Sequence, residues 1–303
     1  MKEFQFIEEL KAVSSTNISN KAYGIGDDAA LLDSKTLIAT DMMTEGIHFH
    51  PSEPINSVID RLFISNISDI AAMGGQASGY KALLCVSIPP SYDKKALLAT
   101  ITSASLKYNV SLIGGDTTSS TNGAVFSLTI IGKRGRHILT RSNALAGDIV
   151  YVSRKLGASR YYLEHNTIHN VLHEAALGEL LGRLDGVGAC TDVSDGLGRD
   201  LANIARASDV MVELDGQLLP IADELAQLKA PNIAEYALSS GEEYALVWTV
   251  RPDRAAHTEK TISKKLNRKV HRIGVVCKNK NWGCYLNTNG KLKDIVMLGY
   301  EHE

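Results

Sequence analysis

The sequence predicts an α/β (α+β) protein built from two mixed α/β domains. Its 303 residues are more than one compact domain usually contains. Strand-like and helix-like apolar runs alternate in both halves, with acidic turns between them, which fits two mixed domains better than one barrel. The segment 141–148, RSNALAGD, is the expected joint. We therefore predict an N-terminal domain at 1–140 and a C-terminal domain at 141–303.

Six segments of the first half have a clear signal. Apolar residues at positions 55, 58, 59, 62, 63, 67, 70 and 71 repeat with the helical period, and Gly74-Gly75 is expected to end that helix. Pro89-Pro90 is expected to stop a strand, because proline cannot donate a hydrogen bond to a sheet. The expected strands are 35–40, 80–88, 110–113 (followed by a glycine turn) and 123–133, and the expected helices are 55–73 and 93–108.

The second half begins with an expected strand at 148–154 and a helical stretch from about 171 to 184. Residues 188–209 have the pattern of a strand, a tight turn and a helix. Further strands are expected at 210–214, 242–250 and 270–276.

The composition is that of an ordinary globular protein, with 44% apolar residues, 22% charged residues and a net charge of −2. This charge does not favour nucleic acid or a membrane as a partner. No apolar run approaches the roughly 20 residues of a membrane span, and the N-terminus MKEFQFIEEL lacks the apolar core of a signal peptide. The four cysteines form no C-x-x-C pair, which indicates reduced thiols, a cytoplasmic location and no zinc site.

The most informative feature is a set of aspartates, most of which follow a strand signal: Asp27, Asp28, Asp41, Asp69, Asp116, Asp192 and Asp195. Carboxylates gathered at strand ends repel one another and lose hydration unless a divalent cation neutralises them. The chain has no Walker loop and no visible Ser-His-Asp, Cys-His or lysine nucleophile arrangement. Since phosphoryl transfer depends mainly on positioning and charge neutralisation, the pattern indicates Mg²⁺ and phosphate chemistry.

The segment 24–30, GIGDDAA, formally matches the dinucleotide fingerprint G-x-G-x-x-A. We reject that interpretation because a poor strand precedes the glycines, no helix follows, and two carboxylates would face the pyrophosphate. We expect instead a flexible loop that brings Asp28 to a metal. The alternative is a glycine turn with solvated acids.

The segment 40–50 follows a strand, and Thr40 and Asp41 offer the oxygen ligands that Mg²⁺ prefers. His48 and His50 would share one face of a strand. No third ligand has a spacing that would complete a zinc site. His48 is therefore interpreted as a contact to a substrate phosphate or ring, with a packed or exposed histidine as the default alternative.

Asp69 is expected in the last turn of its helix, where the macrodipole disfavours an acid, and on the same face as Asn66. An exposed polar stripe is the alternative. In LIGGDTT, the two glycines allow close backbone approach and Asp116 would hold a metal, unless the segment is a plain β-turn.

Asp192 and Asp195 lie three residues apart across the turn of TDVSDGL, and Ser194 lies at an expected helix start, where phosphate is well held. A helix cap would explain Ser194 and Asp195 but not Asp192. Arg141, at the expected joint, is a candidate clamp for a nucleotide phosphate or an ordinary surface arginine.

Together these motifs resemble the thiamine-monophosphate kinase family, in the superfamily of aminoimidazole ribonucleotide synthetase and selenophosphate synthetase. The motifs occur in the family's order and spacing: GIGDDAALL, TDMMTEGIHF, NISDIAAMG, LIGGDTT, LTRSNALAGD, TDVSDGL and SSGEEYAL. The resemblance implies that ATP phosphorylates thiamine monophosphate to thiamine diphosphate, the final step of its biosynthesis, by direct in-line transfer assisted by several Mg²⁺ ions. It also implies an aminoimidazole ribonucleotide synthetase-like fold and a homodimer whose N-terminal domains pair into a β-barrel.

The resemblance assigns no residue to covalent catalysis. It matches the metal ligands to Asp28, Thr40, Asp41, Asp69, Asp116, Asp192 and Asp195. It matches the ATP-binding positions to Gly115, Asp116, Arg141 and Ser194, and the acceptor-binding positions to His48, Glu242 and Tyr300. Two departures affect the expected metal geometry: Ala39 stands where the family often has serine, and Glu243 where it has aspartate.

Two other functions are open at this point. One is another activity of the superfamily, such as ATP-driven amide cyclisation; selenium phosphorylation is disfavoured because no cysteine precedes Cys85. The other is a non-catalytic protein that binds a nucleotide with Mg²⁺ or Ca²⁺ and uses the aspartates structurally.

Overall fold

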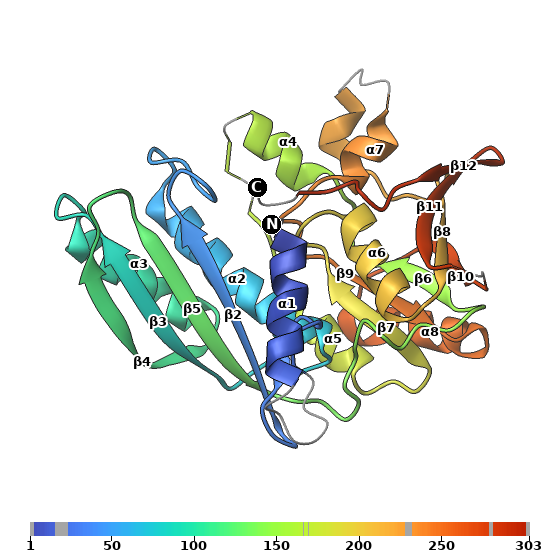
Figure 1. Cartoon of the computed structure of the whole chain (residues 1–303), viewed down its shortest axis with the longest axis horizontal. Helices are drawn as coiled ribbons and strands as arrows, with labels where there is room; N and C mark the ends of the chain where they lie inside the picture. The colour runs from blue at the N-terminus through green and yellow to red at the C-terminus, as the bar shows by residue number, and fades with distance from the viewer. Residues whose placement is uncertain are drawn as a thin grey trace.

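The computed structural model describes residues 3–15, 24–165, 167–168, 170–227, 232–278 and 281–300. Two β-sheets stand side by side, each with its own helices (Figure 1). One sheet is built from the N-terminal half and the other from the C-terminal half, which confirms the prediction of two mixed α/β domains. The boundary that we propose between residues 140 and 141 lies in the connection between the sheets. No helix in the described ranges is long and apolar enough to cross a membrane.

The N-terminal half closely follows its sequence pattern. Its elements are α1 (Glu3–Ser15), β1 (Ala30–Leu31), β2 (Thr36–Thr44), α2 (Ile55–Ala72), β3 (Tyr80–Ile88), α3 (Lys94–Lys107), β4 (Val110–Ser119) and β5 (Val125–Lys133). The predicted helices α2 and α3 and the predicted strands β2, β3 and β5 are all present. Helix α3 begins where the pattern placed it because the Asp93 carboxylate accepts hydrogen bonds from the backbone nitrogens of Lys95 and Ala96. Neither α1 nor the short β1 was expected.

The prediction for β4 was wrong. We expected a strand that ends at residue 113 in a glycine turn, but the strand continues to Ser119 beside β3. Gly115 has a φ of 147°, and a Cβ atom at this position would lie 1.8 Å from the carbonyl oxygen of Leu84. The glycine therefore allows β4 to approach β3 closely instead of turning the chain.

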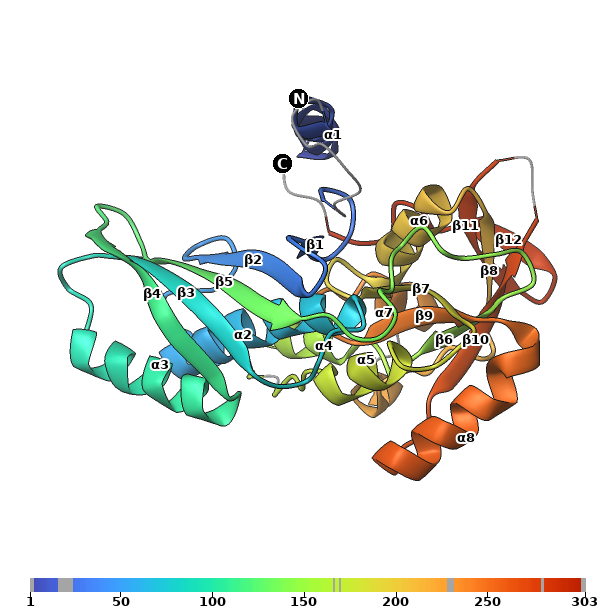
Figure 2. The same cartoon turned by 90° about the horizontal axis from the view of Figure 1, so that it is seen from below.

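The first sheet has the order β1-β2-β5-β3-β4, and α2 and α3 pack on one of its faces (Figure 2). The opposite face is open to solvent in the single chain: Met42 of β2 is 53% exposed and Leu83 of β3 is 38% exposed. Strand β4 is exposed from Ser111 to Ser119. This sheet therefore presents an apolar face and an unpaired edge strand.

The C-terminal half contains a seven-stranded sheet with the order β12-β11-β8-β10-β6-β9-β7. Its elements are β6 (Ile149–Val152), α4 (Ala158–Glu164), α5 (Ala175–Leu181), β7 (Val187–Asp192), α6 (Leu197–Ala207), β8 (Met211–Asp215), η1 (Asp223–Gln227), α7 (Ile233–Leu238), β9 (Leu246–Val250), η2 (Pro252–Arg254), α8 (Ala255–Leu266), β10 (His271–Cys277), β11 (Gly283–Thr288) and β12 (Lys291–Asp294). The predicted helix at 171–184 is shorter than expected, and β9 begins four residues later than expected because 242–245 form a loop.

Helix α2 connects the two halves. Its N-terminal part packs on the first sheet, and its C-terminal Ala71 and Ala72 join a buried cluster with Leu181 of α5 and Trp248 of β9. Gly178 of α5 lies so close to α2 that a Cβ atom there would be 2.3 Å from the Ala71 carbonyl oxygen. The end of α2 is thus held firmly where the two sheets meet.

Candidate active site

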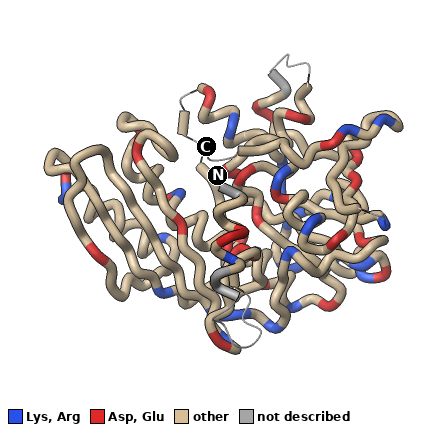
Figure 3. The backbone as a smooth tube through the Cα atoms, in the orientation of Figure 1, with Lys and Arg blue, Asp and Glu red and all other residues tan. Residues whose placement is uncertain are grey.

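Three of the predicted aspartates meet at this junction. Asp28 lies in the loop before β1, Asp69 near the end of α2, and Asp192 at the end of β7. A carboxylate oxygen of each lies within 4.8 Å of those of the other two. Figure 3 shows acidic positions on the backbone where the halves of the molecule meet. Residues separated by more than 160 positions in the chain therefore form one acidic cluster, which we define as Asp28, Asp69 and Asp192.

Asp28 is anchored on one side only. Its Oδ1 atom accepts hydrogen bonds from Arg141 Nη2 and from Thr191 Oγ1, each at 2.7 Å. Its Oδ2 atom is buried, with no hydrogen-bond partner among the described residues. An unpaired carboxylate oxygen is costly to bury. A cation at this position would remove that cost.

The pKa shifts within the acidic cluster also favour a bound cation. Burial raises the pKa of Asp69 well above its ordinary value, and the charges of Asp41 and Asp192 raise it further. Burial also raises the pKa of Asp192, to which the charge of Asp28 contributes. Arg141 lowers the pKa of both groups without balancing the excess negative charge. Mg²⁺ prefers oxygen ligands, and all the side chains of the cluster offer carboxylate oxygens, so these residues fit Mg²⁺.

The cluster borders a cavity of about 570 Å³ between the two halves. The cavity is lined by eight of the predicted site residues: Asp41, His48, Asp69, Asp192, Ser194, Asp195, Glu242 and Tyr300. Predicted metal, nucleotide and acceptor positions thus face one space. Asp28, the third member of the acidic cluster, and Arg141 do not line this cavity, and they are hydrogen-bonded to each other.

The turn after β7 differs from the expectation that Ser194 starts a helix. The N-cap of α6 is Gly196, with a φ of 123° and no side-chain cap. Asp200, in the first turn of α6, instead accepts hydrogen bonds from the backbone nitrogens of Ser194 and Gly196, both at 3.1 Å. The side chain of Asp195 is 43% exposed and lies 3.9 Å from Arg199 Nε. Asp200, which the sequence analysis missed, therefore holds the turn that presents Ser194 and Asp195.

His48 and His50 do not share a strand face, because residues 46–48 form a turn after β2 and His50 lies outside any strand. His48 Nδ1 accepts a hydrogen bond from the backbone nitrogen of Thr44 at 3.0 Å, whereas His50 Nδ1 contacts Ser52 Oγ.

Arg61 of α2 is a second residue that the sequence analysis missed. It is only 8% exposed and donates to Glu242 Oε2 at 2.6 Å. The available signal was a single arginine within the apolar run of α2, where a charge is rarely buried without a partner.

The departure at Glu243 has a structural explanation. Its side chain points away from the cavity: Oε1 accepts hydrogen bonds from the backbone nitrogens of Gly157 and Ser159 and from Ser240 Oγ. Glu243 is 1% exposed. Glu243 therefore fixes the start of α4. Because its side chain does not enter the cavity, having glutamate here in place of aspartate does not shift the carboxylates of the acidic cluster.

Three predicted residues lie elsewhere in the single chain. Thr40 is next to Asp41 in a strand, so its side chain points to the opposite, open face, where it contacts Thr129 Oγ1 at 3.0 Å. Gly115 and Asp116 lie on β4, and Asp116 pairs with Cys85 of the neighbouring strand. Strands β3 and β5 separate β4 from β2, so Asp116 lies roughly 14 Å from β2, at about 4.8 Å per strand.

Comparison with known proteins identifies relatives over the whole chain. The family models described as AIR synthase related protein, N-terminal domain and C-terminal domain, match residues 26–133 and 135–286. The thiamine-monophosphate kinase of Bacillus subtilis (strain 168) is 32% identical in an alignment that covers 100% of this chain and 99% of the relative. That of Pyrococcus horikoshii is 29% identical, with coverage of 92% and 91%.

Solved structures agree with these matches. The structure described as AaThiL complexed with AMPPCP and TMP has a TM-score of 0.80 and 26% identity, with coverage of 100% of this chain and 97% of that one. The thiamine-monophosphate kinase from Stenotrophomonas maltophilia K279a has a TM-score of 0.74 and 26% identity, with coverage of 96% and 98%. The predicted aminoimidazole ribonucleotide synthetase-like fold is therefore confirmed.

Proposed function

The chain belongs to the thiamine-monophosphate kinase family, and on this premise we propose that it transfers the γ-phosphoryl group of ATP to thiamine monophosphate. The observation that carries the proposal is the acidic cluster, with the unpaired Asp28 Oδ2 atom, beside a cavity large enough for phosphate groups. A relative with the same fold was solved with AMPPCP, an ATP analogue, and TMP. A purely structural role would leave the buried negative charge unexplained.

Asp28, Asp41, Asp69 and Asp192 would hold Mg²⁺, and Asp195 faces the same cavity. When bound, the metal would neutralise the phosphates of both substrates and keep the reacting oxygens in line. A phosphate oxygen of thiamine monophosphate attacks the γ-phosphorus of ATP, and the bond from that phosphorus to the oxygen of ADP breaks. The chain's own residues bind and orient the two substrates, and no phosphoenzyme forms.

The other predicted residues are proposed to contact one or the other substrate. Ser194 lines the cavity and is proposed to contact ATP. Arg141 is also proposed to contact ATP, although in the single chain it pairs with Asp28 and does not line the cavity. His48, Glu242 and Tyr300 line the same cavity and are proposed to contact thiamine monophosphate.

The placement of Asp116 supports a homodimer. Gly115 and Asp116 lie on the edge strand β4, roughly 14 Å from β2 at about 4.8 Å per strand, and the Thr40 side chain faces the open side of the sheet. A second copy packed on this face would close the sheets into a β-barrel, cover the exposed Met42 and Leu83, and bring its own Asp116 to the first copy's site.

A mixture of two inactive variants tests this arrangement. If each site takes Asp28 from one copy and Asp116 from the other, a heterodimer of Asp28→Asn and Asp116→Asn has one intact site and one doubly altered site. Random mixing makes about half of the dimers heterodimers, so about one quarter of the wild-type activity is restored. If Asp116 acts within its own chain, both sites of the heterodimer stay defective and activity does not return. The variants alone are the controls.

Product analysis tests the reaction itself. Purified protein with ATP, Mg²⁺ and thiamine monophosphate is expected to form ADP and thiamine diphosphate one-to-one, and a chelator is expected to stop both. ADP without thiamine diphosphate would contradict the acceptor and direct the search to amide substrates of the superfamily. ATP binding without ADP would indicate a non-catalytic nucleotide-binding protein.

The four cysteines are free thiols, two of them buried. Unpaired cysteines are typical of a reducing compartment, and this supports a cytoplasmic location.

A further inference from the structure

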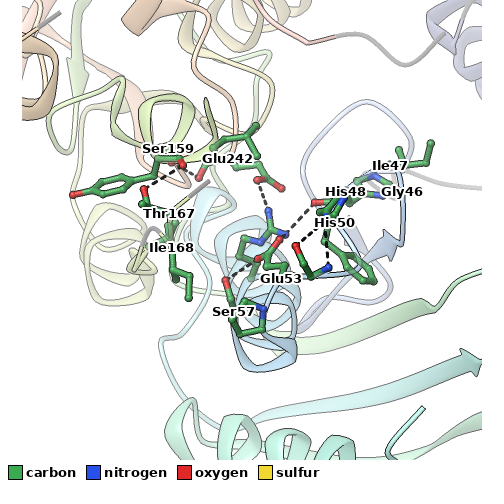
Figure 4. Close-up of a pocket in the computed structure, with 17 residues that line it drawn as sticks. Gly46, Ile47, His48, His50, Glu53, Ser57, Ser159, Thr167, Ile168 and Glu242 are labelled. Carbon is green, nitrogen blue, oxygen red and sulfur yellow. Dashed lines mark hydrogen bonds and ion pairs between the residues drawn. The ribbon is translucent and has the colours of Figure 1, made fainter. Parts of the chain in front are cut away.

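A second cavity of about 350 Å³ adjoins the first. The two cavities share Ile47, His48, Ser159, Leu163 and Glu242 as lining residues. Figure 4 shows the turn that carries Gly46 to His50 on one side of the smaller cavity and Glu242 and Ser159 on the other. The acidic cluster does not line this space, and neither do Arg141, Ser194 and Asp116, which are assigned to ATP.

Arg61 connects the two sides of this cavity. Its Nη1 atom donates to Glu242 Oε2 at 2.6 Å, and its Nη2 atom donates to the His48 carbonyl oxygen at 3.0 Å and to Glu53 Oε2 at 3.1 Å. His48 and Glu53 come from the segment between β2 and α2, whereas Glu242 comes from the C-terminal half. One guanidinium thus ties together three groups from both halves of the molecule.

The conformation of the loop at Glu242 depends on the contact with Arg61. Glu242 has a φ of 55° and Tyr244 a φ of 47°, both in the left-handed region that side chains other than glycine rarely adopt. The backbone nitrogen of Glu242 donates to the Ser194 carbonyl oxygen at 2.7 Å, and its carboxylate is held by Arg61. Without Arg61, the strained loop would lose the contact that fixes the Glu242 side chain, and the carboxylates of Glu53 and Glu242 would lose the cation that they share.

We propose that Arg61 is a positioning residue that shapes the smaller cavity for the organic part of the acceptor. The inference rests on the proposed function, because it takes thiamine monophosphate as that acceptor. Arg61 contributes one positive charge against the two negative charges of Glu53 and Glu242, so the cavity carries a net negative charge. The thiazolium ring of thiamine is a permanent cation, and a negatively charged cavity beside the metal site would favour it.

The test is a kinetic comparison of Arg61→Gln with wild type. The Michaelis constant for thiamine monophosphate is expected to rise about tenfold or more, since Glu242, which is proposed to contact the acceptor, loses the hydrogen bond that positions its side chain. The Michaelis constant for ATP is expected to stay within about twofold, since no nucleotide position lines this cavity. Arg61→Lys keeps the charge but loses the forked geometry, and an intermediate value is expected.

Two further variants separate positioning from stability. Arg251 also pairs with a buried carboxylate, that of Asp148, but lies outside both cavities. Arg251→Gln is therefore expected to lower the melting temperature without raising the Michaelis constant for the acceptor. Adding Glu53→Gln to Arg61→Gln removes the repulsion between Glu53 and Glu242, and part of the acceptor affinity is expected to return.

The proposal is overturned if Arg61→Gln raises the Michaelis constants for ATP and acceptor equally, or if it only lowers stability as Arg251→Gln does. If Arg61→Gln does not fold, Arg61→Lys decides: an unchanged acceptor constant overturns the proposal. A wild-type protein that forms no thiamine diphosphate refutes the proposed function instead, so the two failures are distinct.

Discussion

Replacing Asp69 by asparagine should make the metal-free protein more stable and the enzyme inactive. Asp69 lies within 4.8 Å of Asp28 and Asp192, and two unit charges at that distance repel by about 3.5 kcal/mol at an effective dielectric constant of 20. Burial and the neighbouring charges raise the pKa of Asp69, so proton uptake offsets part of this repulsion as the pH falls. We therefore expect Asp69→Asn to stabilise the metal-free protein by about 1–3 kcal/mol near neutral pH.

The stability gained by Asp69→Asn should depend on pH in a defined direction. Because the folded chain holds the pKa of Asp69 above its unfolded value, the carboxyl group contributes stability at low pH and loses that contribution as the pH rises through the folded pKa. The advantage of Asp69→Asn should therefore grow as the pH rises from the ordinary carboxyl range through the raised folded pKa of Asp69. Thermal unfolding in the presence of a chelator measures it, as a shift of a few degrees.

Turnover should change in the opposite direction. Loss of one metal-binding carboxylate removes several kcal/mol of transition-state stabilisation, which corresponds to a rate reduced about 100-fold or more. Asp148→Asn is the matched control: it alters a buried carboxylate that pairs with Arg251 and does not line the cavity, and it should destabilise the protein while sparing turnover. If Asp69→Asn destabilises the metal-free protein and keeps near-normal turnover, Asp69 is not part of a metal site.

The remaining predictions concern the surroundings of the acidic cluster. Glu243→Ala should lower the free energy of unfolding by about 2–3 kcal/mol, because Gly157, Ser159 and Ser240 lose their hydrogen-bond acceptor. Its Mg²⁺ affinity should be unchanged. Chemical denaturation measures the first effect and metal titration the second, and a weakened affinity would make Glu243 part of the metal site. The apparent Mg²⁺ affinity should fall as the pH is lowered, because burial and neighbouring charges raise the pKa of Asp69 and Asp192 and protons then compete with the metal; calorimetry over a pH series would contradict this with a flat profile.

Much of the fold was predictable because local rules governed it. The helical period of α2 and the apolar run of β3, with Pro89-Pro90 after it, each indicated an element whose position the structure confirms. β4 could not be predicted in the same way. Its glycines resemble a turn in the sequence, but the close approach of Gly115 to Leu84 depends on a neighbouring strand that the pattern does not reveal.

The site was predictable only in part. The aspartates and His48 stood out because acids and glycines adjoined apolar strands, and the fold brings Asp28, Asp69 and Asp192 together as the pattern suggested. Arg61 was missed because its function depends on partners far away in the sequence, among them Glu242. Thr40 shows a further limit: adjacent residues in a strand point to opposite faces, so motif membership did not determine which space its side chain enters.

The central claim is that the acidic cluster holds the metal that makes this chain a kinase for thiamine monophosphate. The most direct measurement is the rate of thiamine diphosphate formation over a series of Mg²⁺ concentrations, in wild type and in Asp69→Asn. The account predicts one thiamine diphosphate for each ADP in the wild type, no product without Mg²⁺, and a rate in the variant that added Mg²⁺ does not restore. Product formed without Mg²⁺, or equal rates in the two proteins, would contradict it.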